Sequence, residues 1–141
     1  MASHDEVDSY LIKMGLPYEQ VSEGTWVVHP EGEHRATIGV TIEAPIVLFS
    51  IPMFELAATD TQREPLFRAL LELNADLLHS SYRLEGDRVV LTGAQQLENL
   101  DFNEFQAMVD DMCIALDNHI DRIATLIHRG APNAAAAEGS A

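Results

Sequence analysis

Apolar side chains recur every three or four residues in three stretches of this chain, which is the spacing of one face of a helix. The first stretch covers residues 7–14 and is followed by Gly15, a common residue just after a helix. The second follows a capping pattern at Thr61 and Glu64, and the third, over residues 101–127, begins with the same pattern at Asp101 and Glu104. We therefore expect three helices, of which the last is the longest.

The segments between these helices have strand patterns. Residues 35–42 alternate apolar with polar or small side chains, which is typical of a half-buried strand. Residues 46–51 are apolar on both faces, so we expect a central strand that is covered from two sides. Gly86 and Asp87 suit the turn of a hairpin. The strand-like segments are residues 18–22, 25–29, 35–42, 46–51, 81–85 and 88–92.

Together these elements predict a single α+β domain over residues 1–129. We expect a strand meander between the first two helices and a hairpin between the last two. The predicted fold is a five-stranded antiparallel sheet with three helices, in the order α-β-β-β-α-β-β-α. Residues 130–141 are mostly small and lack any periodicity, so we expect them to form a disordered tail.

The charge balance narrows the classes of partner. The chain has 23 acidic and 8 basic side chains, which give a formal net charge of -15. Such a surface repels nucleic-acid phosphates and favours a basic protein partner, although the charge can also serve solubility alone. No apolar run reaches the roughly 18 residues of a bilayer span, and the N-terminus lacks a secretory pattern. We therefore expect a cytoplasmic protein with no direct contact to nucleic acid or membrane.

Residues that could bind a metal ion are scattered along the chain. None of the six histidines has another histidine or a cysteine at zinc-ligand spacing. Asp110, Asp117 and Asp121 share one side of the third helix without a chelating loop, so we interpret them as a solvated acidic face. Cys113 lies on an apolar helical pattern and should be packed. The sequence predicts no metal and no cofactor.

A possible nucleophile occurs where Ser80 and Ser81 follow His79. Neighbours in sequence do not establish the geometry of a catalytic triad, and no Gly-x-Ser-x-Gly turn accompanies them. The glycines occur singly at turns rather than in a phosphate-binding loop. We predict that the protein is not an enzyme; the alternative is a small-molecule-binding or enzymatic domain with an unrecognised pocket.

Five apolar residues of the predicted strands are candidates for partner binding, because three helices need not cover both faces of the sheet. Exposed apolar patches usually mark interfaces. The other interpretation of these residues is internal packing. The candidates are Trp26, Val28, Val47, Phe49 and Ile51.

The order of elements and three short segments of this chain resemble the YbjN family. The segments are the leucine-rich residues 70–76, the hairpin at residues 82–91, and Leu100 with Asp101 at the start of the last helix. That family looks like the class I type III secretion chaperones in its fold. The resemblance covers nearly the whole chain before Gly130, and its motifs are patterns of leucines and turns.

The resemblance implies a small, acidic, non-enzymatic homodimer that binds an extended segment of a client protein. It also implies that the second helix packs partly against its twin, through Leu66, Leu70, Leu73 and Leu77. We therefore expect a chaperone-like or regulatory adaptor that binds a partner protein, by strand addition or in a groove.

Overall fold

The computed structural model of the chain describes residues 4–30, 36–56 and 63–130. Over these residues the chain forms three helices and six strands. In chain order they are α1 (His4–Met14), β1 (Tyr18–Ser22), β2 (Thr25–Val28), β3 (Ile38–Glu43), β4 (Ile46–Glu55), α2 (Arg63–Asn74), β5 (Ser80–Glu85), β6 (Arg88–Gln96) and α3 (Phe102–Gly130).

All strands pair antiparallel in one sheet, in the order β1-β2-β3-β4-β6-β5. The α+β class and the three helices are as the sequence predicts, but the sheet has six strands rather than five. Strands β1 and β2 form a hairpin around Gly24, and both lie at strand-like segments of the sequence, residues 18–22 and 25–29. The φ of 78° at Gly24 is a conformation that glycine adopts readily. All six strand-like segments of the sequence therefore form strands of the sheet, and the predicted count of five was one too low.

Several element ends differ from the prediction. Strand β4 continues to Glu55, past Pro52, because its pairing with β6 shifts at a bulge between Pro52 and Phe54. Beyond Ser50 strand β3 no longer pairs with β4, so that edge of β4 is open where the proline lies. Helix α2 ends at Asn74, so Leu77, which the resemblance placed on this helix, follows its end.

The start of α3 follows the predicted capping pattern. The backbone N–H of Glu104 donates to Asp101 Oδ1 at 2.8 Å, and the backbone N–H of Asp101 donates to Glu104 Oε1 at 3.2 Å. The corresponding pattern before α2 includes Thr61, which lies outside the described residues, as do residues 131–141 of the tail predicted at 130–141.

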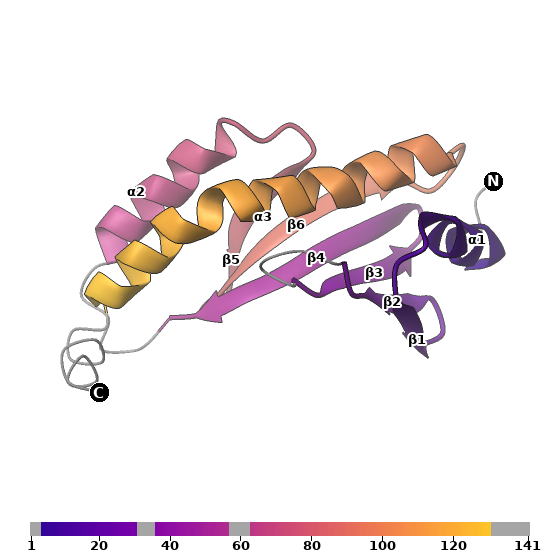
Figure 1. The fold of residues 1–141 in the computed structure, drawn as a ribbon, viewed down its shortest axis with the longest axis horizontal. Helices are drawn as coiled ribbons and strands as arrows, with labels where there is room; N and C mark the ends of the chain where they lie inside the picture. The colour runs from indigo at the N-terminus through magenta and orange to yellow at the C-terminus, as the bar shows by residue number, and fades with distance from the viewer. Residues whose placement is uncertain (1–3, 31–35, 57–62, 131–141) are drawn as a thin grey trace.

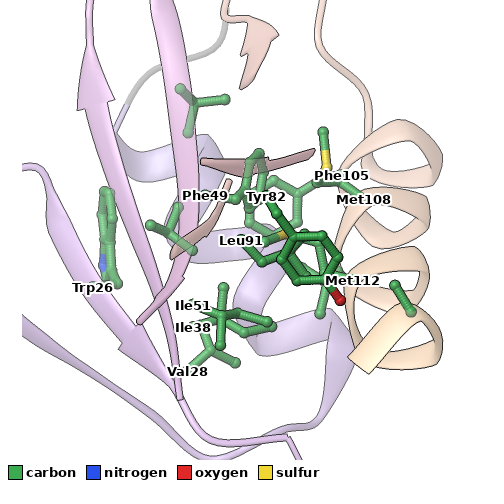
Figure 2. Close-up of a cluster of buried hydrophobic side chains, with 14 of the residues drawn as sticks. Trp26, Val28, Ile38, Phe49, Ile51, Tyr82, Leu91, Phe105, Met108 and Met112 are labelled. Atoms are coloured by element: carbon green, nitrogen blue, oxygen red, sulfur yellow. The ribbon is translucent and has the colours of Figure 1, made fainter. Parts of the chain in front are cut away.

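The helices cover one face of the sheet (Figure 1). Residues that pair directly across strands point to the same face, and Trp26, Val40, Phe49 and Gly93 form one such row. Phe49 packs against Phe105 of α3, with ring centroids 5.2 Å apart. Figure 2 shows side chains from the sheet and from α3 meeting in this core. The row therefore lies beneath the helical layer.

The opposite face of the sheet has no described helix across it (Figure 1). On that face the side chains of Val27, Ile46 and Leu48 are only half-buried. The prediction that the strand at 46–51 is central is confirmed, because β4 lies between β3 and β6. The prediction that this strand is covered on both faces is wrong for the described residues, because all three helices pack on the same face of the sheet.

Candidate functional site

The five sheet residues that the sequence offers for partner binding lie in the core. The exposed fraction is 0% for Val28, Val47 and Phe49, 1% for Trp26 and 2% for Ile51. Their side chains point toward the helical layer, so a partner of the folded chain cannot reach them. Internal packing, the other interpretation of these residues, is what the structure shows.

The leucines expected at a dimer contact are also mostly internal. Leu66, Leu70 and Leu73 are 1%, 7% and 6% exposed, because they form the inner side of α2. Leu77 follows the end of the helix and is half-buried. These four residues therefore do not form an outer stripe, and a contact between two folded chains cannot use them as a set.

The outer side of α2 presents different apolar side chains. Leu71 is 70% exposed and Phe67 is half-buried, while Leu84 on the edge strand β5 is 50% exposed. These side chains line a groove of about 280 Å³ between α2 and β5. The buried side chains of Leu70 and Val89 also line it. We name this hollow the α2–β5 groove.

Charged side chains of both signs border the α2–β5 groove. On α2, Arg68 lies 3.4 Å from Glu64, and on β5, Arg83 lies 2.5 Å from Glu85. All four side chains are largely solvent-exposed, so each pair contributes little to stability, about 0–1 kcal/mol. The groove is thus an apolar surface with a rim of mixed charge, the composition of a protein–protein contact.

The edge of the sheet beside the groove is partly closed. Strand β5 ends the strand order, so its outer backbone groups face no other strand. The backbone N–H of Tyr82 nevertheless donates to Asn74 Oδ1 at 2.7 Å, and Asn74 Nδ2 donates to the carbonyl oxygen of Tyr82 at 3.2 Å. A partner strand could therefore pair at Tyr82 only by displacing Asn74.

A second hollow lies between the α2–β5 connection and α3. Its volume is about 500 Å³, and its lining mixes apolar with polar side chains. We name it the acidic cleft, for the two aspartates on its walls. The side chains that matter for its chemistry are Asp76, Leu78, His79, Asp111, Ile114 and His119.

Two histidine contacts define the polar part of the acidic cleft. His79 Nδ1 lies 2.5 Å from Asp111 Oδ2, and His119 Nδ1 lies 2.8 Å from the hydroxyl of Tyr82. Burial lowers the pKa of His119, against the opposing charge of Asp76, and burial raises the pKa of Tyr82 to about 12. The His119 ring and the Tyr82 phenol are therefore both neutral at pH 7.

The candidate nucleophiles are not activated in this arrangement. Ser80 lines the acidic cleft, but Ser81 alternates with Tyr82 along β5 and points to the opposite face of the sheet. No hydrogen bond joins His79 to a serine hydroxyl within the described segments. Burial and then the charges of Asp110 and Asp117 raise the pKa of the Cys113 thiol, so it stays protonated at pH 7.

Clustered metal ligands and membrane-spanning helices are both absent from the described residues. The described residues contain no group of three or more His, Cys, Asp or Glu side chains that could hold a metal ion. Asp110, Asp117 and Asp121 lie along α3 as exposed side chains. None of the described helices combines the length and the apolar character needed to cross a bilayer.

The sequence matches the model of a known protein family. The profile of the CesT_Tir_1 family matches residues 1–129, which is nearly the whole chain. No curated protein matches the sequence.

Comparison with solved structures gives several similar folds. YbjN from E. coli shares 12% sequence identity, with a TM-score of 0.62 over 85% of this chain and 93% of that one. A chain of the heterodimeric ExoU–SpcU complex, from the type III secretion system of Pseudomonas aeruginosa, shares 15% sequence identity. Its TM-score is 0.61, over 86% of this chain and 97% of that one. A chain of the HopA1–SchA chaperone–effector complex shares 12% sequence identity, with a TM-score of 0.57 over 81% of this chain and 89% of that one. These likenesses concern the fold.

Proposed function

This chain belongs to the CesT_Tir_1 family, and from that membership we propose that it is a non-catalytic, chaperone-like module that binds a partner protein in the cytoplasm. Two of the similar folds come from complexes of two proteins, one of them a chaperone with its effector. A shared fold does not establish a function by itself, so the proposal needs a site on this chain. The α2–β5 groove supplies it.

The observation that carries the proposal is the exposed apolar lining of the α2–β5 groove. Leu71 and Leu84 both line it with 70% and 50% of their surfaces exposed, and Phe67, which also lines it, is half-buried. Complete burial of a leucine or phenylalanine side chain stabilises a complex by about 1.5–3 kcal/mol relative to exposure. A protein surface that covers these side chains therefore gains free energy from each of them.

We assign the α2–β5 groove to a second copy of this chain, which makes the module a homodimer. A net charge of -15 makes two copies repel one another over most of their surface. Four of the 8 basic side chains nevertheless lie on α2 and the β5–β6 hairpin. In a two-fold contact the same patch meets itself, so arginines of one copy can face glutamates of the other. The four are Arg63, Arg68, Arg83 and Arg88.

The partner protein then binds outside the dimer contact, where acidic side chains prevail. The charge of that surface favours a partner with basic segments, because opposite charges accelerate encounter and discourage acidic competitors.

The main alternative for this chain is a domain that binds or converts a small molecule. Such a molecule would use the acidic cleft, which is lined by polar as well as apolar side chains.

Affinity capture distinguishes these two functions. The tagged full chain is isolated from its native cells, and the eluate is analysed both by protein mass spectrometry and for small molecules. The proposal predicts a different protein in an amount comparable to the bait. A co-purified small molecule with no such protein would contradict the proposal and favour the alternative.

A further inference from the structure

We propose that the acidic cleft binds an arginine side chain of the partner protein, with its aliphatic part on Leu78 and Ile114 and its guanidinium group beside Asp111. The inference rests on the proposed protein-binding function, and it adds the chemistry of the residue that is recognised. Three features of the cleft point to this occupant: its apolar walls, its charge, and an unpaired hydrogen-bond donor.

The apolar walls come from two elements that are distant in sequence. Leu78, on the α2–β5 connection, is 90% exposed, and Ile114, on α3, is 56% exposed. Both line the cleft, so they present apolar surface on either side of the same hollow. The long aliphatic part of an arginine packs well on such surface while its charged end stays close to water.

The charge of the cleft selects a cation. Asp76 and Asp111 line it, and no lysine or arginine is among the described residues that do so. His79 Nδ1 contacts one of the two carboxylate oxygens of Asp111, Oδ2, at 2.5 Å, and a carboxylate can accept further hydrogen bonds. Arg122, the basic residue whose charge acts on His119, is itself bound to Glu72, with Arg122 Nη2 2.5 Å from Glu72 Oε1.

The unpaired donor is on His119, which lines the cleft and is 8% exposed. The Tyr82 hydroxyl and His119 Nδ1 share a hydrogen bond of 2.8 Å, and we assign the phenol as its donor, because a phenol is a stronger acid than the N–H of a neutral imidazole and the ring nitrogen is the stronger base. The ring is neutral because burial lowers its pKa, and its proton is therefore on Nε2. Nε2 has no partner among the described residues. It can donate to a backbone carbonyl next to the bound arginine, which favours a polypeptide over a free cation.

The test uses the isotope-labelled full chain and a small peptide probe, N-acetyl-leucyl-arginine amide, in an NMR titration. The matched probe replaces arginine with citrulline, which has the same shape without the charge. We expect the arginine probe to shift the amide signals of Asp111 and Ile114. We expect the citrulline probe to bind about fivefold more weakly, the effect of one partly exposed charge pair.

Two variants locate the charge. Asp111→Asn should weaken binding of the arginine probe by a similar factor, and Asp121→Asn, which removes the same charge from an exposed position on α3, should not. Equal affinity for the two probes, shifts confined to another surface, or no binding at millimolar concentrations would each overturn the inference. A protein partner captured while the arginine probe fails to bind would reject only the cleft, whereas a bound probe without any captured partner would reject the proposed function.

Discussion

The side chain of Asn74 makes both of the hydrogen bonds with Tyr82 that a neighbouring strand would make. The Tyr82 backbone N–H donates to Asn74 Oδ1, and Asn74 Nδ2 donates to the Tyr82 carbonyl oxygen. Asn74 is the last residue of α2, and Tyr82 lies in the edge strand β5. The end of a helix thus protects an exposed sheet edge, which otherwise invites pairing with other chains.

Replacing Asn74 with alanine should remove this protection. We expect the free energy of unfolding to fall by about 1–3 kcal/mol, because two backbone groups of Tyr82 lose their partners in a partly buried place. Denaturant unfolding measures the change, and Asn118→Ala, at an exposed position on α3, is the control. Equal stability of the two variants would show that water replaces Asn74 at no cost.

Gly93 of β6 lies under α3 at a place with no room for a side chain. A Cβ atom added there would be 2.7 Å from Met108 Sδ and 2.8 Å from the backbone oxygen of His79. The backbone cannot move aside easily, so we expect Gly93→Ala to lower the free energy of unfolding by about 1–3 kcal/mol.

Gly39 provides the matched control for Gly93→Ala. It lies on the sheet face without a described helix, and an added Cβ would be 3.3 Å from the flexible hydroxyl of Ser50. Gly39→Ala should therefore be less destabilising. If calorimetry gives both variants the same loss, the close packing of α3 on β6 is not as described.

The buried ring of His119 should make stability depend on pH. Its pKa in the folded chain lies below the unfolded value near 6.5, because burial disfavours the charged ring. The folded state therefore binds this proton less readily than the unfolded state. Its contribution to stability is fully present above about pH 6.5 and is lost as the pH falls toward the folded pKa.

The variant His119→Gln removes this titration while keeping a side chain that can accept a hydrogen bond from Tyr82. Between pH 7 and pH 5, the wild type should lose more stability than His119→Gln. The charges of Asp76 and Arg122 act on the ring in opposite directions and are unchanged in the variant. Parallel stability curves for the two proteins would show that His119 does not titrate in this range.

Local sequence signals predicted the elements but not their arrangement. The capping residues Asp101 and Glu104 and the alternation in β3 act over a few residues, so the sequence alone reveals them. The face of a strand that is covered depends on contacts between distant segments, such as Phe49 with Phe105. The sequence therefore left two interpretations of the five candidate residues open, partner binding and internal packing, and only those contacts decide between them.

The site shows the same limit. The sequence shows which residues of α2 are apolar. Whether Leu70 or Leu71 is exposed depends on the rotation of α2 about its own axis as it packs on β5 and α3. The pair formed by Tyr82 and His119 joins residues 37 positions apart. Neither feature leaves a local pattern, because both arise only when β5 packs beneath α3.

Sedimentation equilibrium tests the assignment of the α2–β5 groove most directly. The wild type should be a dimer at tens of micromolar, and Leu71→Glu should be a folded monomer, because a charge would enter a closed apolar contact at a cost of several kcal/mol. Ile12→Glu, at a 62% exposed position on α1, should remain dimeric. A monomeric wild type, or a dimer that survives Leu71→Glu, would contradict the account.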